Sequence, residues 1–204
     1  MSADRNRTFA IGVTGASGAL YAVRTIAALL EQGCHLELVF SDFGRRLLRD
    51  ELGEAASVDR FADYLAGRYG DAVGRGSFVV HSNKDLGAGI ASGSHACGGM
   101  AVVPCSMKTL AGIANGLSRS LVERAADVML KEKRPLVIVP RETPMSLPQL
   151  RNMVLAAEAG ATLLPAMPAF YQGPRTLDDL ADFMAGKILG ALGLEHGLYP
   201  PWKG

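Results

Sequence analysis

The sequence predicts an α/β fold: a mostly parallel sheet of about six strands, covered by helices on both faces as a three-layer sandwich. Short apolar runs typical of buried strands alternate along the chain with longer stretches of helical spacing. Such alternation favours parallel pairing, because each helix carries the chain back to the edge where the next strand begins. The 204 residues, 49% of them hydrophobic and 20% charged, suit one globular domain with a full core.

The individual elements follow from the apolar runs and from the residues that interrupt them. An apolar run that begins at Phe9 and stops at Thr14 is the first predicted strand. The other strands are predicted at 35–40, 77–81, 101–103, 136–139 and 161–164. Helical spacing predicts helices at 19–30, 42–52, 58–69, 121–133, 147–159 and 177–192. Gly33 and Gly160 mark helix ends, and Pro104 is expected to close the fourth strand.

Composition and charge exclude several classes of function. The formal net charge of +1 provides no basic field for nucleic acid. No apolar run approaches the roughly 18 residues of a membrane span, and residues 1–7 lack the apolar centre of a signal peptide. Cys34, Cys97 and Cys105 have no metal-ligand spacing and indicate a reducing compartment. We therefore expect a soluble cytoplasmic protein with neither a membrane nor a nucleic-acid partner.

The turn after the first strand is the first candidate binding site. It reads Thr14-Gly15-Ala16-Ser17-Gly18 and leads directly into the first helix. The glycines let the backbone approach a ligand closely, and the start of the helix favours an anion. Ser17 adds a hydroxyl at the same place. A phosphate site and a plain glycine-rich turn are both compatible with this segment taken alone.

The turn after the fourth strand, Pro104 to Leu110, is the second candidate. Its hydroxyls and N–H groups stand at a helix start, where they suit part of a cofactor, although Ser106 is also a typical N-cap. The small residues of the preceding 91–100 segment suit a loop against a flat ligand. Within that loop, His95 is either an acid or base, or a surface histidine. Cys97 and Cys105 have no visible activating partner and are expected to be packing or loop residues.

Charged residues near the fifth strand suit a phosphate-bearing substrate. Arg124 and Lys131 lie two helical turns apart, on one face of the predicted helix. Arg141 and Glu142 leave the fifth strand at its carboxyl end, where a cation holds phosphate and a carboxylate moves a proton. We interpret the neighbouring pair 133–134 as a solvated charged surface. Because ligands of parallel sheets bind beyond the carboxyl ends of the strands, the two turns, Ser41 and this strand end are expected at one edge.

The last third of the chain adds three candidates. Tyr171 offers a hydroxyl to a phosphate, and Lys187 stands in an otherwise apolar helix. Trp202, the single tryptophan, either stabilises a carbocation through its aromatic face or anchors the tail by packing.

Taken together, these segments resemble the UbiX-type flavin prenyltransferases. The resemblance covers nearly the whole chain, and its most specific parts are TGASG, ASGS, PCSMKTLAGIANG, ERAADVMLKEKRPLVIVPRETP and PAFY. It implies a Rossmann- or flavodoxin-like sheet, dodecamers built of trimers, and a flavin-binding domain over residues 1–204 with a substrate-covering C-terminal tail. It also implies metal-independent transfer of the prenyl group of dimethylallyl monophosphate to N5 and then C6 of reduced FMN. The product then serves UbiD-type decarboxylases.

The resemblance also assigns residues. It implies FMN contacts at Gly15, Ala16, Ser17, Ser41, Ser106, Met107, Lys108, Thr109 and Arg141. It implies substrate contacts at Arg124, Lys131, Glu142, Tyr171, Lys187 and the shared Ser17, with Glu51 reaching a neighbouring subunit's site. Ser17, Lys131, Glu142 and Trp202 would be catalytic. The chain departs from commoner family versions at Ser120, at Lys187 and in the loop 94–97, which bears on fine substrate preference.

Two alternative functions remain at this point. FMN-dependent cysteine decarboxylases share the fold, but they carry an Asn-Met motif where this chain reads Pro140-Arg141-Glu142-Thr143-Pro144-Met145. A non-enzymatic FMN-binding module would have no need of Lys131, Arg141, Glu142 and Tyr171. Cations with a carboxylate therefore favour a phosphate substrate. The sequence leaves open the preference between monophosphate and diphosphate, the decarboxylase served, the subunit count, and whether FMN co-purifies.

Overall fold

Six parallel strands form one sheet in the structure, a computed structural model that describes residues 7–200. The sheet order is β3-β2-β1-β4-β5-β6, the order of doubly wound Rossmann folds. The strands are β1 (Thr8–Val13), β2 (His35–Phe40), β3 (Ser77–Ser82), β4 (Gly99–Cys105), β5 (Leu136–Pro140) and β6 (Thr162–Leu163). The predicted α/β class and the number of strands are confirmed.

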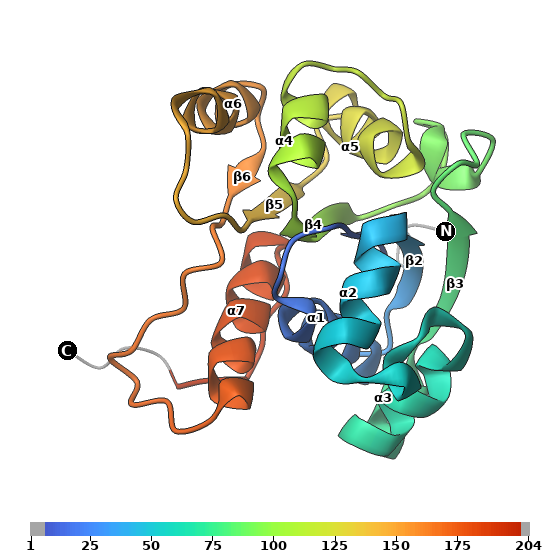
Figure 1. The fold of residues 1–204 in the computed structure, drawn as a ribbon. Helices are drawn as coiled ribbons and strands as arrows, with labels where there is room; N and C mark the ends of the chain where they lie inside the picture. The colour runs from blue at the N-terminus through green and yellow to red at the C-terminus, as the bar shows by residue number, and fades with distance from the viewer. Residues whose placement is uncertain (1–6, 201–204) are drawn as a thin grey trace.

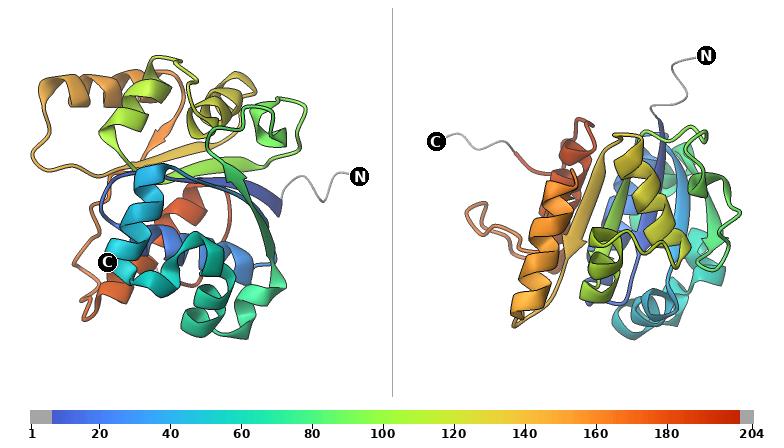
Figure 2. Two further views of the ribbon diagram at one scale, coloured as in Figure 1. Left: turned by 45° about the vertical axis from the view of Figure 1, so that its right-hand side comes forward. Right: turned by 90° about the horizontal axis from the view of Figure 1, so that it is seen from above.

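Helices cover both faces of this sheet (Figure 1). On one face lie α1 (Ala19–Glu31), α2 (Asp42–Leu52), α3 (Phe61–Tyr69) and α7 (Leu177–Ala191). On the other lie α4 (Met107–Ala114), α5 (Leu121–Lys131) and α6 (Leu147–Glu158). The views in Figure 2 show the same two layers with the sheet between them. Within residues 7–200, no helix has the length and apolar character needed to cross a membrane.

Two separate cores follow from the alternation of side chains along the central strands. Phe9, Ile11 and Val13 point into the core under α1 and α7, and Ala10 points into the core under α4 to α6. These side chains are at most 2% exposed, so each face of the sheet is sealed by its helix layer. On the second face a Cβ at Gly12 would lie 3.1 Å from Val122 Cγ1, so glycine lets α5 lie close to β1.

The boundaries of several elements differ from the prediction for local reasons. Pro104 does not close β4, which runs from Gly99 to Cys105 instead of 101–103. Because Pro104 has no N–H to donate, the pairing of β4 with β5 shifts register between Val102 and Cys105. The helix predicted at 58–69 begins at Phe61, after a 3₁₀ turn at Val58–Arg60. Helix α5 ends at Lys131, two positions early, where the chain turns into left-handed backbone at Lys133 (φ 55°).

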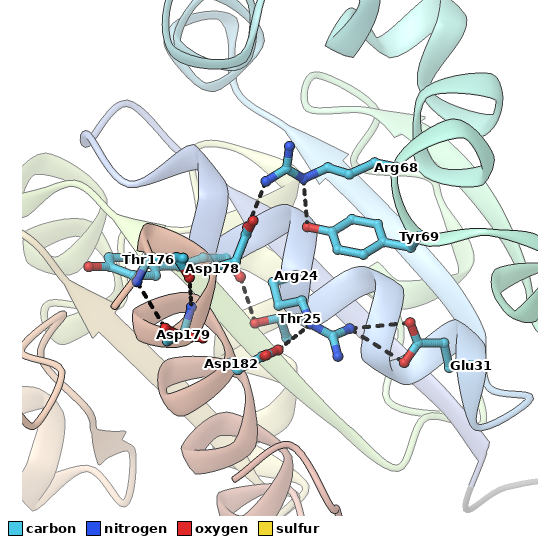
Figure 3. A network of polar contacts seen from close by, with 10 residues as sticks. Arg24, Thr25, Glu31, Arg68, Tyr69, Thr176, Asp178, Asp179 and Asp182 are labelled. Carbon is cyan, nitrogen blue, oxygen red and sulfur yellow. Dashed lines mark hydrogen bonds and ion pairs between the residues drawn. The ribbon is translucent and has the colours of Figure 1, made fainter. Parts of the chain in front are cut away.

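A partly buried ion-pair network joins α1 to α7 (Figure 3). Arg24 of α1 donates through Nε to Asp182 Oδ1 of α7 at 2.5 Å, and its Nη1 lies 3.3 Å from Glu31 Oε1. Its side chain is only 12% exposed. Beside it, Arg68 of α3 pairs with Asp178 at 2.6 Å. The guanidinium of Arg24 is largely withdrawn from water. The stability of the folded protein therefore depends on the two carboxylates that pair with it, Asp182 and Glu31.

We therefore expect Asp182→Asn to lower the free energy of unfolding by about 1–3 kcal/mol, because it leaves a desolvated cation with one carboxylate fewer. Arg46→Ala is the matched control, since it breaks an ion pair with Asp50 whose side chains are 68% and 53% exposed. That change should cost less than about 0.5 kcal/mol. Urea unfolding of both variants measures the difference, and equal losses would contradict the assignment.

Candidate functional site

Thr14 joins the turns that follow the two central strands, through its buried hydroxyl and through its backbone N–H, which donates to Pro104 O at 3.2 Å. Thr14, which is 1% exposed, donates through Oγ1 to the carbonyl of Pro104 at 2.9 Å. The same oxygen accepts from the backbone N–H of Ser106 at 2.7 Å. The turn after β1 and the turn after β4 are therefore held side by side. They lie where the chain order reverses from β1 to β4, the position at which doubly wound sheets bind ligands.

The first turn exposes its backbone where a ligand would approach. Gly15 and Ser17 are exposed, whereas Ala16 between them is 3% exposed and belongs to the packed interior. A Cβ at Gly15 would lie 2.6 Å from Phe43 Cβ, so only glycine fits beside α2. Gly18 has φ 117°, a left-handed conformation that glycine adopts without strain, and it begins α1.

The second turn is an N-cap as well as a polar surface. Ser106 Oγ accepts from the N–H of Thr109 at 3.3 Å and donates to Thr109 Oγ1 at 3.0 Å. The capping role of Ser106 considered from the sequence is thus present. Both hydroxyls are partly exposed at the start of α4, next to the exposed Lys108 and the buried Met107.

Two further predicted residues meet this edge. The N–H of Ser41 donates to Val13 O at 2.9 Å, which sets the start of α2 against the end of β1. From the end of β5, Arg141 donates through Nε to Ser17 O at 3.2 Å, and its N–H bonds to Cys105 O. The prediction that both turns, Ser41 and the end of β5 share one edge is confirmed. Among the described residues, no hydrogen bond occupies either Nη group of Arg141 or the hydroxyl of Ser17.

Glu142 follows Arg141 and is half-buried at the same strand end. One carboxylate oxygen, Oε1, accepts from the N–H of Thr143 at 3.0 Å. The other oxygen has no hydrogen-bond partner in the described part of the chain. The carboxylate is therefore oriented by the backbone and keeps one oxygen for a proton.

Glu51 occupies a place that the sequence did not indicate. Its carboxylate accepts from the N–H groups of Gly18 at 3.0 Å and Ala19 at 2.8 Å, within the same chain. This carboxylate supplies the negative charge that the start of α1 favours. A phosphate bound at these two N–H groups would compete with Glu51, so the open part of the first turn is Ser17 and not the start of the helix. The neighbouring-subunit role implied by resemblance stays a prediction.

The cations of α5 form a second group away from this edge. Arg124 donates through Nε to Ala91 O at 3.1 Å and pairs with Asp127 at 2.6 Å. Lys131 pairs with Glu132, and a Cβ at Gly93 would lie 2.7 Å from its Nζ. Both cations therefore lie on one face of α5, as their spacing predicts, and that face meets the 91–95 segment. Among residues 7–200, neither forms a hydrogen bond or ion pair with the Thr14–Gly18 turn.

Aromatic residues on and near α7 form a third group. Lys187 is exposed, with Nζ 5.4 Å from the ring centre of Phe183 and 6.0 Å from that of Tyr199. The ring of Tyr171 lies edge-on to Phe183 at 6.2 Å. Trp202, and with it the end of the expected covering tail, lies outside the described residues.

A polar hollow beside Ser41 adds residues that sequence reasoning missed. It measures about 420 Å³ at the carboxyl ends of β2 and β3, and three cations line it: Arg45, Lys84 and Arg119. Asp42 is the acidic side chain in its lining. Arg45 could have been predicted from the sequence, because it follows Ser41 closely. Lys84 and Arg119 could not, because they belong to separate loops that only the fold brings together.

Comparison with known proteins gives consistent relatives. A family model described as Flavoprotein matches residues 1–188. The flavin prenyltransferase UbiX of Halalkalibacterium halodurans is 47% identical over 195 residues, covering 95% of this chain and 92% of the relative. The flavin prenyltransferase UbiX of Alkalihalophilus pseudofirmus is 45% identical over 202 residues, covering 99% of both.

Solved structures share the fold over nearly the whole chain. AnUbiX in complex with FMN and dimethylallyl pyrophosphate aligns with a TM-score of 0.86 at 36% identity, covering 98% of each chain. A dodecameric FMN-dependent UbiX-like decarboxylase from Escherichia coli aligns at 0.83 and 40% identity, covering 97% of this chain and all of the other. The FMN-dependent cysteine decarboxylase TvaF aligns at 0.52 and 14% identity over 77% of this chain, which shows a shared fold alone.

The cysteines are packing residues, as predicted for Cys97 and Cys105. Cys34, Cys97 and Cys105 are all buried, and that burial raises the pKa of each thiol above its ordinary value. Cys105 is 0% exposed, although it stands directly before the Ser106 turn. Within the described part of the chain, no group of three or more His, Cys, Asp or Glu side chains is arranged to hold a metal ion.

Because the thiolate is the reactive form, these raised pKa values predict that the folded protein resists thiol reagents at pH 8. Titration with Ellman's reagent should detect no thiol within minutes in buffer and all three after unfolding in guanidinium. A thiol that reacts rapidly in the folded protein would show that its surroundings are not closed.

Proposed function

Since the chain belongs to the UbiX flavin prenyltransferases of the flavoprotein family, we propose that it transfers a dimethylallyl group from dimethylallyl monophosphate to N5 and C6 of reduced FMN. It is accordingly a flavoprotein and a transferase. The observation that carries the assignment of the site is the joined edge at Thr14, where exposed glycine backbone, hydroxyls and a cation from three strand ends meet.

The residues of this edge fit FMN. Gly15 is exposed and has no side chain, so a flat or phosphate-bearing group reaches its backbone, while Phe43 packs where a Cβ would stand. Arg141 keeps both Nη groups available and matches an anionic oxygen bidentately. Ser41 and Thr109 place further hydroxyl donors at the same edge, and the hydroxyl of Ser106 bonds to that of Thr109. We assign the flavin contacts to Gly15, Ala16, Ser17, Ser41, Ser106, Met107, Lys108, Thr109 and Arg141.

Bound reduced FMN supplies the two acceptor atoms, N5 and C6, and the remaining chemistry belongs to the chain. When the C–O bond of the prenyl phosphate breaks, negative charge remains on the phosphate and positive charge develops on the allyl carbon. Arg124, Lys131 and Lys187, with the hydroxyl of Tyr171, stabilise the leaving phosphate. Preorganised donors of this kind contribute ~3 kcal/mol each in a site closed to water. The aromatic face of Trp202 is assigned to the allyl cation.

Glu142 is the proposed base. When the bond to N5 forms, the C–O bond breaks and the departing phosphate takes the N5 proton. The prenyl group is then a neutral alkene, so the bond to C6 requires that the phosphate give a proton to the alkene while C6 loses its own proton. The oxygen of Glu142 that makes no hydrogen bond accepts the C6 proton, relayed through the phosphate and the Ser17 hydroxyl. The other carboxylate oxygen is held by the N–H of Thr143, so the orientation of the carboxylate is set before the substrate binds.

The candidate substrate cations lie in separate places in one copy of the chain. Within residues 7–200, Arg124 and Lys131 form no hydrogen bond or ion pair with Lys187 or with the Thr14 edge. We propose that copies of the chain bring these groups together in a homo-oligomer, a dodecamer like the related Escherichia coli protein. Light scattering that finds an active monomer would contradict this.

Cellular partners follow from the same assignment. We propose that the enzyme works in the cytoplasm and that its product serves a UbiD-type decarboxylase. The cysteine-decarboxylase alternative is disfavoured by Arg141 and Glu142 at the end of β5, which suit a phosphate and a transferred proton. A non-enzymatic module is disfavoured by the same pair.

The direct test incubates the protein anaerobically with reduced FMN and dimethylallyl monophosphate, then analyses the flavin by mass spectrometry. We expect the flavin to gain one dimethylallyl unit and inorganic phosphate to be released. A parallel reaction with the diphosphate separates the two substrates, since AnUbiX was crystallised with the pyrophosphate. Unchanged flavin with both donors would overturn the proposed function.

Gly15→Val should abolish FMN binding without unfolding the sheet, because its side chain meets Phe43 in the turn that faces the flavin. Gly67→Val is the control, since a Cβ at Gly67 meets no atom within 4 Å. Isothermal titration with FMN, together with circular dichroism, measures both effects. Parental affinity in Gly15→Val would show that the flavin lies elsewhere.

Glu142→Gln should bind FMN and the prenyl phosphate normally and slow turnover by a factor of about 10²–10⁴, because the amide cannot accept the proton. Lys131→Ala should instead raise KM for the prenyl phosphate, with Lys133→Gln, an exposed neighbour, as its control. Steady-state phosphate release gives kcat and KM for all three variants. Wild-type turnover in Glu142→Gln would eliminate the role of base.

A further inference from the structure

A buried carboxylate with histidine partners lies outside the site described so far. Glu37, in the middle of β2, is 6% exposed. It contacts His81 Nε2 of β3 through one oxygen, and its other oxygen lies 3.1 Å from His95 Nε2. Carboxylates are rarely buried unless they are paired, so this one is held by both imidazoles. None of the catalytic steps proposed above uses it.

His95 connects this carboxylate to the 91–95 segment. The backbone of that segment gives three carbonyls to arginines. Arg134 donates to His95 O at 2.8 Å and to Gly93 O at 2.6 Å, and Arg124 donates to Ala91 O at 3.1 Å. The prediction that position 134 is merely solvated charge is therefore wrong, because its guanidinium is partly buried under the segment. His95 is likewise not a plain surface histidine, because its ring is tethered to the sheet.

The segment lies against both cations of α5. Nε of Arg124 bonds to Ala91 O and Nη1 bonds to Asp127, which leaves Nη2 as the group available to a ligand. Gly93 lies so close to Lys131 that a side chain there would collide with its Nζ. The 91–95 backbone therefore holds Arg124 through the carbonyl of Ala91, and at Gly93 it lies against the Lys131–Glu132 ion pair.

We propose that Glu37, with His81 and His95, is a positioning unit for substrate binding: it ties the 91–95 segment to the sheet so that Arg124 and Lys131 are aimed at the prenyl phosphate. The inference rests on the proposed function of those two cations. At the other end of the segment, buried Ile90 and Ala91 already anchor the chain in the core under α5. At residue 95, Arg134 holds the backbone carbonyl and Glu37 holds the imidazole, so Glu37 completes the second anchor by fixing the His95 side chain.

The test compares substrate binding with flavin binding. Glu37→Ala removes the acceptor of both imidazoles, and we expect KM for dimethylallyl monophosphate to rise about tenfold or more, because displacements near 1 Å are costly at such sites. The FMN Kd should stay within about twofold, since the flavin edge at Thr14 is separate. Glu37→Gln should recover part of the loss, because its amide oxygen still accepts from one imidazole.

Two further variants separate positioning from general damage. His95→Leu, at a half-buried position, should reproduce the KM increase of Glu37→Ala. His35→Asn is the matched control: it lies on the same strand and face, is 42% exposed, bonds to Ser77, and has its Nε2 3.9 Å from Glu37. It should leave KM unchanged.

The outcomes are distinct. A wild-type KM in His95→Leu would overturn the inference, and so would a rise in FMN Kd that parallels the rise in KM. If Glu37→Ala does not fold, the KM of His95→Leu decides. If the wild-type protein makes no product, the proposed function fails instead. In that case hydrogen exchange of the 92–95 amides tests the tether alone. Faster exchange in His95→Leu than in His35→Asn supports it, and equal rates contradict it.

Discussion

The hydroxyl of Thr14 is the contact on which the flavin edge depends. β1 and β4 pair directly, so their turns leave the sheet side by side, although they lead into different helices. Thr14 fixes how the two turns lie against each other: its hydroxyl donates to the carbonyl of Pro104 and accepts from the N–H of Ser106, and its own N–H donates to the same carbonyl. A buried hydroxyl without those partners would cost free energy, and the pairing is therefore specific as well as stable. The ligand groups of both turns inherit their spacing from it.

The distribution of charge over one chain explains why the active site is proposed to lie between subunits. Three cations are assigned to the leaving phosphate, and within a single subunit each of them is held by separate contacts. Arg124 is paired with Asp127, Lys131 with Glu132, and Lys187 lies over aromatic rings. In the proposed assembly these cations would meet at the anionic substrate, which neutralises them.

The 91–95 segment links the buried Glu37 of the sheet to the candidate substrate cations of α5. It is short of apolar side chains, so packing alone cannot hold it. Its carbonyls are satisfied by Arg124 and Arg134, and its histidine reaches the buried Glu37. A segment held by polar contacts at both ends transmits small shifts of the sheet to the substrate cations, whereas the flavin edge is fixed by its own contacts around Thr14.

The sequence by itself determined the class of fold, the order of its elements and the edge at which the candidate ligand-binding groups meet. These features can be predicted without coordinates. The spacing of apolar residues and helix-ending glycines such as Gly33 are local, and the rule that ligands bind beyond the carboxyl ends of parallel strands depends only on topology. The sequence did not indicate that Glu51 covers the start of its own α1, that Arg45, Lys84 and Arg119 share one hollow, or that Glu37 holds His95. These contacts join residues far apart in the chain, and a side chain's partner across such a separation is set by how the layers pack. Only the tertiary structure decided them, because burial and distance, rather than residue type, determine which charges must be paired.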